Sequence, residues 1–165
     1  MLENVSYFST DSCSISPIMP LDRNTLVMEC AKLYKDWFDK LNSEDPLDDY
    51  IESLDDCIEE RGIVILSRVK DRSVGFRYAE RWFPKSESHL YLAAAYVVPE
   101  FRRNGIYGTM IDLTELVARQ QGFSTASSHT TIDGDSLSVL LKKDYLELPE
   151  SDIRHSSLGN VFKRL

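Results

Sequence analysis

The sequence predicts one domain of the α+β class, in which a mixed sheet is flanked by helices. Three observations support this prediction. The 165 residues are 42% hydrophobic, which suits a single compact core. Two amphipathic helical stretches come early and three strand-like stretches follow them, as expected for antiparallel hairpins. A strand, helix, strand pattern then follows, and together these patterns imply a mixed sheet.

The chain opens with a lead-in and a first helix. Residues 1–13 are expected to be weakly ordered or extended, and a short strand is expected at 14–19. Asp22 or Asn24 can then cap a helix. Its apolar residues recur at helical spacing and are Leu26, Cys30, Leu33, Trp37 and Leu41.

A second helix begins at Asp45-Pro46, which reads as a cap followed by a first-turn proline. Gly62 supplies its end. The acidic residues fill the face opposite the apolar one, as is typical of a solvated face. The apolar face carries Leu47, Tyr50, Ile51, Leu54 and Ile58.

Three strands follow in a meander. Residues 63–66 read as a buried strand and 70–73 as a turn, before a second strand at 74–83. After a loop at 84–88, a third strand covers 90–98 and ends at a proline, which cannot donate to a ladder.

The last part of the chain alternates helices and strands. A helical face ends near Gly122, and strand 123–130 follows. That face carries Ile106, Met110, Leu113 and Val117. A last helix starts within 133–135, and strands at 145–148 and 161–165 close the sheet. The last helix carries Leu137, Leu140 and Leu141.

Charge and cysteine content limit the partners. The net charge is −8, acidic residues concentrate in 44–60, and no basic run offsets them, so long nucleic acids are disfavoured. Acidity suits a cationic substrate or simply solubility. No apolar run could span a bilayer and no secretory signal opens the chain, so the cytoplasm is expected. Cys13, Cys30 and Cys57 are expected to be reduced thiols, and no metal site is predicted.

The strongest functional signal is the junction after strand 90–98. Arg102 and Arg103 precede a helix that begins near Gly105. The first turn of a helix offers unpaired N–H groups and a partial positive charge, which can hold a phosphate. The residues alone therefore suggest an anion, such as a diphosphate, held by the backbone of 103–109. The alternative is an ordinary turn with two solvated arginines.

This junction resembles the coenzyme A signature of the GNAT-type N-acetyltransferases. That signature reads Arg or Gln, two variable residues, Gly, one variable residue, then Gly or Ala. Arg102 and Gly105 fit, whereas Tyr107 stands where Gly or Ala is usual. The order of elements also resembles the GNAT layout over nearly the whole chain. The resemblance implies a GNAT fold with a mostly antiparallel, twisted sheet, and acetyl-CoA as cosubstrate.

In that family the strand before the signature splays from its neighbour and pairs with the pantetheine arm. The resemblance implies that Ala95, Tyr96 and Val97 make these contacts. It also implies that the Val97 N–H polarises the thioester carbonyl. The phosphate-side contacts are expected from Arg102, Arg103, Asn104, Gly105, Ile106, Tyr107, Gly108 and Thr109. Asp133, at the position of a usual Asn in the last helix, is also predicted to contact coenzyme A.

The expected catalytic residues are atypical. Many GNAT enzymes place a proton-donating tyrosine in the last helix, and Leu140 occupies that position. Tyr91, at the position of the histone-type glutamate, and His129, at a strand end, are the predicted catalytic side chains. By the two-residue period of a strand, Tyr91 is expected to face the same side as Ala93, Ala95 and Val97. Weaker candidates are Glu80, His89 and His155.

The acceptor is predicted only by class. Segment 90–97 and the ending 158–163 resemble the diamine and polyamine branch, but Ala93 and Ala94 replace its acidic pair. Trp82 and Phe83 could line an acceptor pocket or belong to the core.

The leading hypothesis is an N-acetyltransferase acting by direct transfer to a primary amine of a small molecule or protein. The rival is a GNAT-fold protein that binds acyl-CoA or a protein partner without efficient turnover. No membrane partner is expected, and a homodimer is suggested by family analogy alone.

Overall fold

The computed structural model describes residues 5–9, 21–41, 44–81, 88–130, 135–148 and 160–165. These residues form seven strands and four helices, with a short 3-10 turn, η1, at Pro99–Phe101. In chain order the other elements are β1 Val5–Ser9, α1 Arg23–Asp39, α2 Leu47–Glu59, β2 Ile63–Val69, β3 Arg72–Arg81, β4 His89–Val97, α3 Ile106–Gln120, β5 Thr125–Ser128, α4 Asp135–Leu141, β6 Leu146–Glu147 and β7 Val161–Arg164.

The strands form one sheet in the order β1-β2-β3-β4-β5-β7-β6. Five of the six neighbouring pairs are antiparallel, and only β4 and β5 run parallel. A parallel pair needs a crossover, and α3 supplies it. The predicted mixed, mostly antiparallel sheet is therefore confirmed.

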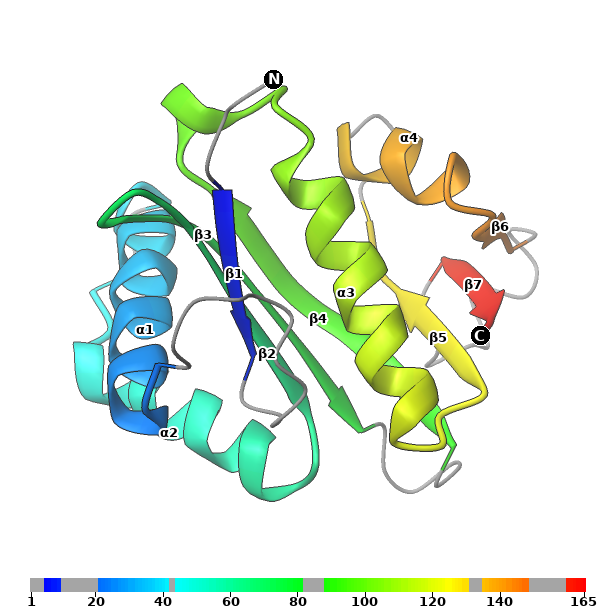
Figure 1. Ribbon diagram of the computed structural model, residues 1–165, viewed down its shortest axis with the longest axis horizontal. Coiled ribbons are helices and arrows are strands. Elements are labelled where there is room, and N and C mark those ends of the chain that lie inside the picture. The colour runs from blue at the N-terminus through cyan, green and yellow to red at the C-terminus, as the bar shows by residue number, and fades with distance from the viewer. Residues whose placement is uncertain (1–4, 10–20, 42–43, 82–87, 131–134, 149–159) are drawn as a thin grey trace.

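The helices cover both faces of this sheet (Figure 1). On one face, α1 and α2 bury a core that includes Phe76, Tyr78 and Tyr96 from the sheet. On the other, α3 buries a second core that includes Ile65, Leu90 and Val97. Alternate residues of β4 therefore serve two different cores, which is why this strand reads as continuously apolar.

The boundaries of the first two helices differ slightly from the prediction. Asp22 caps α1, accepting a hydrogen bond from the Thr25 N–H at 2.9 Å. The helix ends at Asp39, so Leu41, predicted on its apolar face, lies beyond it and is 61% exposed. In α2, Pro46 stands at the N-cap itself rather than in the first turn.

The hairpin of β2 and β3 is tighter than predicted, because Val69 already pairs with Arg72. Strand β1 pairs with β2 from within the segment expected as a lead-in. The strand predicted at 14–19, and the start of the last helix at 133–134, lie outside the described residues.

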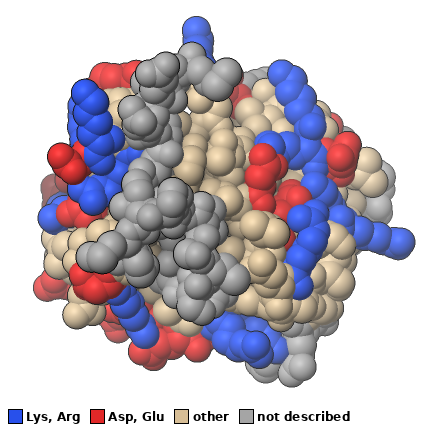
Figure 2. All heavy atoms as spheres, in the orientation of Figure 1, with Lys and Arg blue, Asp and Glu red and all other residues tan. Residues whose placement is uncertain are grey.

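The surface and the thiols agree with the composition. Cys30 and Cys57 are buried free thiols, as predicted, and Cys13 lies outside the described residues. On the face shown in Figure 2, Lys and Arg are interspersed with Asp and Glu rather than gathered in one basic patch. Among the described helices, none has the length and apolar character needed to cross a membrane.

Candidate functional site

A β-bulge in β4 determines which way its side chains face. Ala94 pairs with Tyr78 and Tyr91 pairs with Glu80, so Leu92 and Ala93 together oppose the single residue between them. Leu92 packs in the α3 core, whereas Ala93 packs against the α1–α2 core.

The bulge corrects one expectation about Tyr91. Both of its neighbours, Leu90 and Leu92, belong to the α3 core, so Tyr91 lies on the α1–α2 face together with Ala93. Val97 faces α3 instead, and so does Ala95, directly opposite Arg77. The expected common face for all four residues is therefore wrong, because the extra residue shifts the alternation by one.

Beside this bulge, β4 and β5 separate. They pair only at His89, Leu90 and Tyr91, after which the Ser128 hydroxyl donates to the Leu92 carbonyl at 3.0 Å. From Ala94 to Val97 the strand pairs with β3, and the described residues give it no ladder partner on the β5 side. An open backbone edge of this kind can accept an extended ligand as an added strand.

The open edge presents the Val97 backbone. The Val98 N–H donates to the Val74 carbonyl in β3 at 2.9 Å. Peptide groups alternate along a strand, so the Val97 N–H points to the opposite, open edge. The Val97 carbonyl on that edge accepts a hydrogen bond from Arg102 Nε at 2.9 Å. The arginine thus fixes the end of the edge next to the loop.

The first turn of α3 follows the same edge and is open to an anion. Gly105, at the N-cap, has φ 80°, and a Cβ there would meet nothing within 4 Å. The first intrahelical bond is from the Thr109 N–H to the Gly105 carbonyl at 3.0 Å. The N–H groups of Ile106, Tyr107 and Gly108 therefore do not take part in the ladder of the helix, which is the condition that the predicted anion site requires.

The loop before α3 holds the predicted arginines in exposed positions. The Arg102 guanidinium lies 5.8 Å from the centre of the Tyr96 ring. Arg103 has φ 62°, a left-handed conformation that costs a non-glycine residue about 1 kcal/mol. Asn104 donates to the Phe101 and Arg102 carbonyls at 3.2 and 3.0 Å, so its side chain shapes the loop. Asp133 lies outside the described residues.

Two predicted catalytic residues are in direct contact. Tyr91 Oη and His129 Nδ1 are 2.9 Å apart, and their rings meet edge to face. Burial raises the pKa of Tyr91, and the nearby Glu80 carboxylate adds to this. Burial also raises the pKa of Glu80, which pairs with Tyr91 across the strands. His129 itself is exposed, directly after β5.

The other sequence candidates are structural or lie outside the described residues. His89 is 4% exposed and contacts the Thr125 and Ser127 hydroxyls at 2.7 and 2.8 Å. Burial lowers its pKa, and it joins β4 to β5 where the strands are still paired. Leu140 is fully buried in the α3 core. The candidates outside the described residues are His155, Trp82 and Phe83.

Sequence reasoning missed two buried polar residues near α3. Arg77 is 2% exposed and lies 5.5 Å from the Tyr107 ring, while Tyr145 is 1% exposed. Arg77 carries no sequence signal, since it sits in an apolar strand. Tyr145 did carry a sequence signal. It occupies the phenylalanine position of the last-helix pattern, five residues after Leu140, which occupies the tyrosine position.

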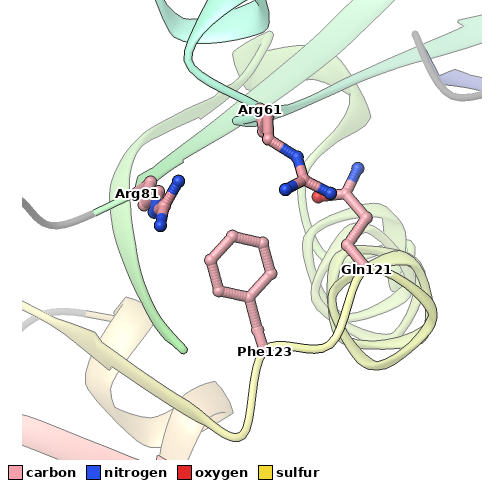
Figure 3. Close-up of a pocket in the computed structure, with 4 residues that line it drawn as sticks. All are labelled: Arg61, Arg81, Gln121 and Phe123. Atoms are coloured by element: carbon pink, nitrogen blue, oxygen red, sulfur yellow. The ribbon is translucent and has the colours of Figure 1, made fainter. Parts of the chain in front are cut away.

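A separate small hollow lies at the other end of the sheet (Figure 3). It is lined by Arg61, Arg81, Gln121 and Phe123, and the Phe123 ring points between the two guanidinium groups. Arg81 pairs with Leu90 near the start of β4, and Gln121 follows the last turn of α3. The hollow is therefore remote from the first turn of α3 and from the open edge.

No protein-family model matches the chain, and no curated protein sequence matches it. Solved structures do match the chain in fold. A GNAT-family acetyltransferase from Staphylococcus aureus Mu50 is 14% identical, with a TM-score of 0.66 over 98% of this chain and 99% of that one. A ribosomal-protein-alanine N-acetyltransferase from Brucella melitensis is 14% identical, with a TM-score of 0.70 over 87% and 97% of the two chains.

A third similar structure is an aminoglycoside N-acetyltransferase in complex with CoA. It is 14% identical, with a TM-score of 0.62 over 86% of both chains. Likeness at this identity is a statement about architecture. Together with the sheet order and the parted β4 and β5, it shows that the chain has the GNAT fold.

Proposed function

We propose that the chain is an acetyl-CoA-dependent N-acetyltransferase that acts on a primary amine of a small molecule or a protein. The observation that carries this proposal is that three features lie next to one another. The open edge of β4, the uncapped first turn of α3 and the Tyr91–His129 pair all adjoin the gap between β4 and β5. A structurally similar aminoglycoside acetyltransferase binds CoA, which supports the same ligand here.

Each part of the gap fits a part of acetyl-CoA. The first turn of α3 and the exposed Arg102 and Arg103 suit the diphosphate. The edge from Ala93 to Val97 suits the two amides of pantetheine, which can pair with it as a strand does. When bound, acetyl-CoA would supply an activated acyl group. The Val97 N–H would hold the carbonyl oxygen as negative charge develops on it.

The proposed general base is His129. If its Nδ1–H donates to Tyr91 Oη, its Nε2 keeps a lone pair that can take one proton from the neutral amine as its nitrogen attacks, directly or through one water. The raised pKa of Tyr91 keeps that hydroxyl neutral near pH 7, so it orients the imidazole without competing as a base. The pair lies on the α1–α2 face, which leaves the α3 side to coenzyme A.

The acceptor is proposed as a primary amine rather than specifically a polyamine. Ala93 and Ala94 pack against the α1–α2 core, where the polyamine branch carries two acidic residues. Similar structures include enzymes named for a ribosomal protein and for aminoglycosides, which span protein and small-molecule amines.

A second candidate function is acyl-CoA binding without efficient turnover. Leu140, at the position of the usual proton-donating tyrosine, is buried in the core and offers no proton. This observation bears on the rate of transfer and leaves the binding features unchanged.

The test combines a turnover assay with a binding assay. Purified protein is mixed with acetyl-CoA and a panel of amines, and free thiol is measured. We expect thiol release above the protein-free rate for at least one amine. Arg102→Glu is expected to weaken coenzyme A binding at least tenfold, because it reverses a charge beside the diphosphate. Arg164→Glu makes the same charge change on β7, beside the paired end of β5, and is expected to leave affinity unchanged.

Tight binding without thiol release across the panel would favour the binding module. Unchanged affinity in Arg102→Glu, in protein with wild-type thermal stability, would show that the phosphate site is elsewhere.

A further inference from the structure

The α3 side of the gap contains a buried arginine, Arg77, for which the described part of the chain offers no counterion. Arg77 is 2% exposed, and no described residue hydrogen-bonds its fully buried Nε. Among the described residues Arg77 makes no ion pair either, and its guanidinium lies 5.5 Å from the centre of the Tyr107 ring. A buried charge without a partner is costly unless an anion offsets it.

The surrounding groups do not offset it. One buried carboxylate lies nearby, that of Glu115, which is 5% exposed on its side chain. It already accepts from Lys163 Nζ at 2.9 and 3.0 Å and from Arg119 at 3.0 Å. Two cations, Lys163 and Arg119, therefore already share the Glu115 carboxylate, and the Arg77 charge leaves the cluster positive.

A buried tyrosine hydroxyl completes the cluster. Tyr145 is 1% exposed, and its ring lies against Lys163 Nζ, 5.4 Å from the ring centre. Its Oη is buried, and no described residue is placed with the geometry of a hydrogen bond to it. Burial raises the pKa of Tyr145, the Arg77 charge opposes this, and the Glu115 carboxylate beside the hydroxyl raises the pKa further, so the hydroxyl keeps its proton.

The cluster adjoins the proposed path of coenzyme A. Arg77 pairs directly with Ala95, one of the residues on the open edge of β4. The Ala95 side chain lies on the same face of the sheet as Arg77. Because it is small, it leaves room for the arginine side chain to extend across β4 toward the gap. Tyr107, which covers the guanidinium, belongs to the first turn of α3. Arg77 thus adjoins both the first turn of α3 and the open edge, and Tyr145 lies close enough to Arg77 to feel its charge.

We propose that Arg77 and Tyr145 form a leaving-group site that holds the sulfur of coenzyme A as a thiolate. This proposal rests on the proposed acetyl transfer. As the amine nitrogen bonds to the carbonyl carbon, the carbon–sulfur bond breaks and its electron pair stays on sulfur. Arg77 balances that charge, and Tyr145 donates a hydrogen bond to the sulfur. The proton lost by the amine goes to His129, and the thiolate is protonated by solvent after release.

This site removes the need for a proton donor at position 140. A free thiol has a pKa of about 8.5, only about 1.5 above neutrality. A cation within about 4–6 Å lowers the pKa of an acid by about 1–3 units, which is enough to make the thiolate stable near pH 7. The ionisable groups of the cluster are Arg77 from β3, Tyr107 and Glu115 from α3, Lys143 and Tyr145 after α4, and Lys163 from β7. Glu115 alone would raise the thiol pKa, and Lys163 and Arg119 offset its charge.

The test is a titration of the bound thiol. The ultraviolet absorbance of the thiolate is followed against pH with coenzyme A bound to the protein, and desulfo-coenzyme A provides the baseline. We expect the bound thiol to titrate about 1–3 units below free coenzyme A. Arg77→Met should abolish this shift, and Tyr145→Phe should reduce it. Arg81→Met, on the same strand but in the hollow at the far end, should retain it.

The outcomes separate the two proposals. Coenzyme A that binds but titrates as it does in free solution would overturn the leaving-group site and leave the proposed acetyl transfer standing. So would a full shift in a folded Arg77→Met variant. Absence of coenzyme A binding would overturn both proposals. If Arg77→Met does not fold, Arg77→Gln, which keeps a polar group in the buried space, takes its place.

Discussion

Two histidines of the same sheet region illustrate how environment assigns a role. His89 is enclosed between two hydroxyls, whereas His129 is exposed and has one ring nitrogen engaged by Tyr91. A histidine with both nitrogens held cannot accept a substrate proton without breaking a contact. His129 therefore remains the better base, although only 40 residues separate it from the structural histidine.

Substitution of the two histidines should affect different measurements. His129→Gln is expected to lower kcat about 100-fold or more and leave coenzyme A affinity unchanged, because general-base catalysis contributes about 10²–10⁴-fold. Steady-state kinetics with the best amine of the panel, together with a binding titration, would check this. An undiminished kcat would remove His129 from the mechanism.

His89→Gln is the matched comparison and should act on stability. We expect a loss of about 1–3 kcal/mol in the free energy of unfolding, because buried hydroxyls lose their partners. In the wild type, burial lowers the pKa of His89, so the unfolded chain binds the proton more readily. Stability should therefore fall as the pH drops below about 6.5, the unperturbed value, and the variant should lack this component. Denaturation at several pH values would measure both effects.

At the scale of elements, α3 has a left-handed glycine at each end. Gly105 has φ 80° before the helix and Gly122 has φ 88° after it. An added Cβ would meet nothing within 4 Å at either position, so alanine there tests backbone conformation alone. Substitution of each glycine in turn therefore separates an effect on the proposed ligand site from an effect on the stability of the helix.

Gly105→Ala and Gly122→Ala should each lose about 1–2 kcal/mol of stability, the cost of a left-handed alanine. Only Gly105→Ala should also weaken coenzyme A binding, because a shift of its backbone moves the N–H groups of the first turn. Unfolding curves and binding titrations on both variants provide the comparison. Equal affinity in the two variants would show that the α3 N-terminus does not hold the phosphates.

At the scale of the whole molecule, periodic patterns in the sequence predicted the sheet but not its irregularities. The order of helices and strands from α1 to β7 followed from apolar spacing, glycines and prolines. The bulge at Leu92–Ala93 did not, because an alanine run carries no register. The burial of Arg77 without an ion pair among the described residues also could not be predicted, since it depends on β3, α3 and the segment after α4 meeting in space.

The same limit applies to the site. The signature around Arg102 and Gly105 predicted a helix start with a left-handed glycine at its N-cap, because that geometry resides in contiguous backbone. Tyr91 and His129 were predicted separately, and their contact needed the parallel pairing of β4 and β5. Sequence therefore predicts what one segment does alone, and tertiary structure adds what two segments do together.

The net charge of −8 allows a final prediction about the acceptor. If the acidic surface attracts the amine, KM for a diamine should rise with salt, about fivefold for an interaction of about 1 kcal/mol. KM for a monoamine with a neutral tail should change less. Glu52→Gln with Asp56→Asn removes two exposed charges from α2 and should reduce the salt effect for the diamine. Steady-state kinetics at two salt concentrations would measure this. Equal salt effects for both amines would mean that the acidity does not select the acceptor and serves solubility alone.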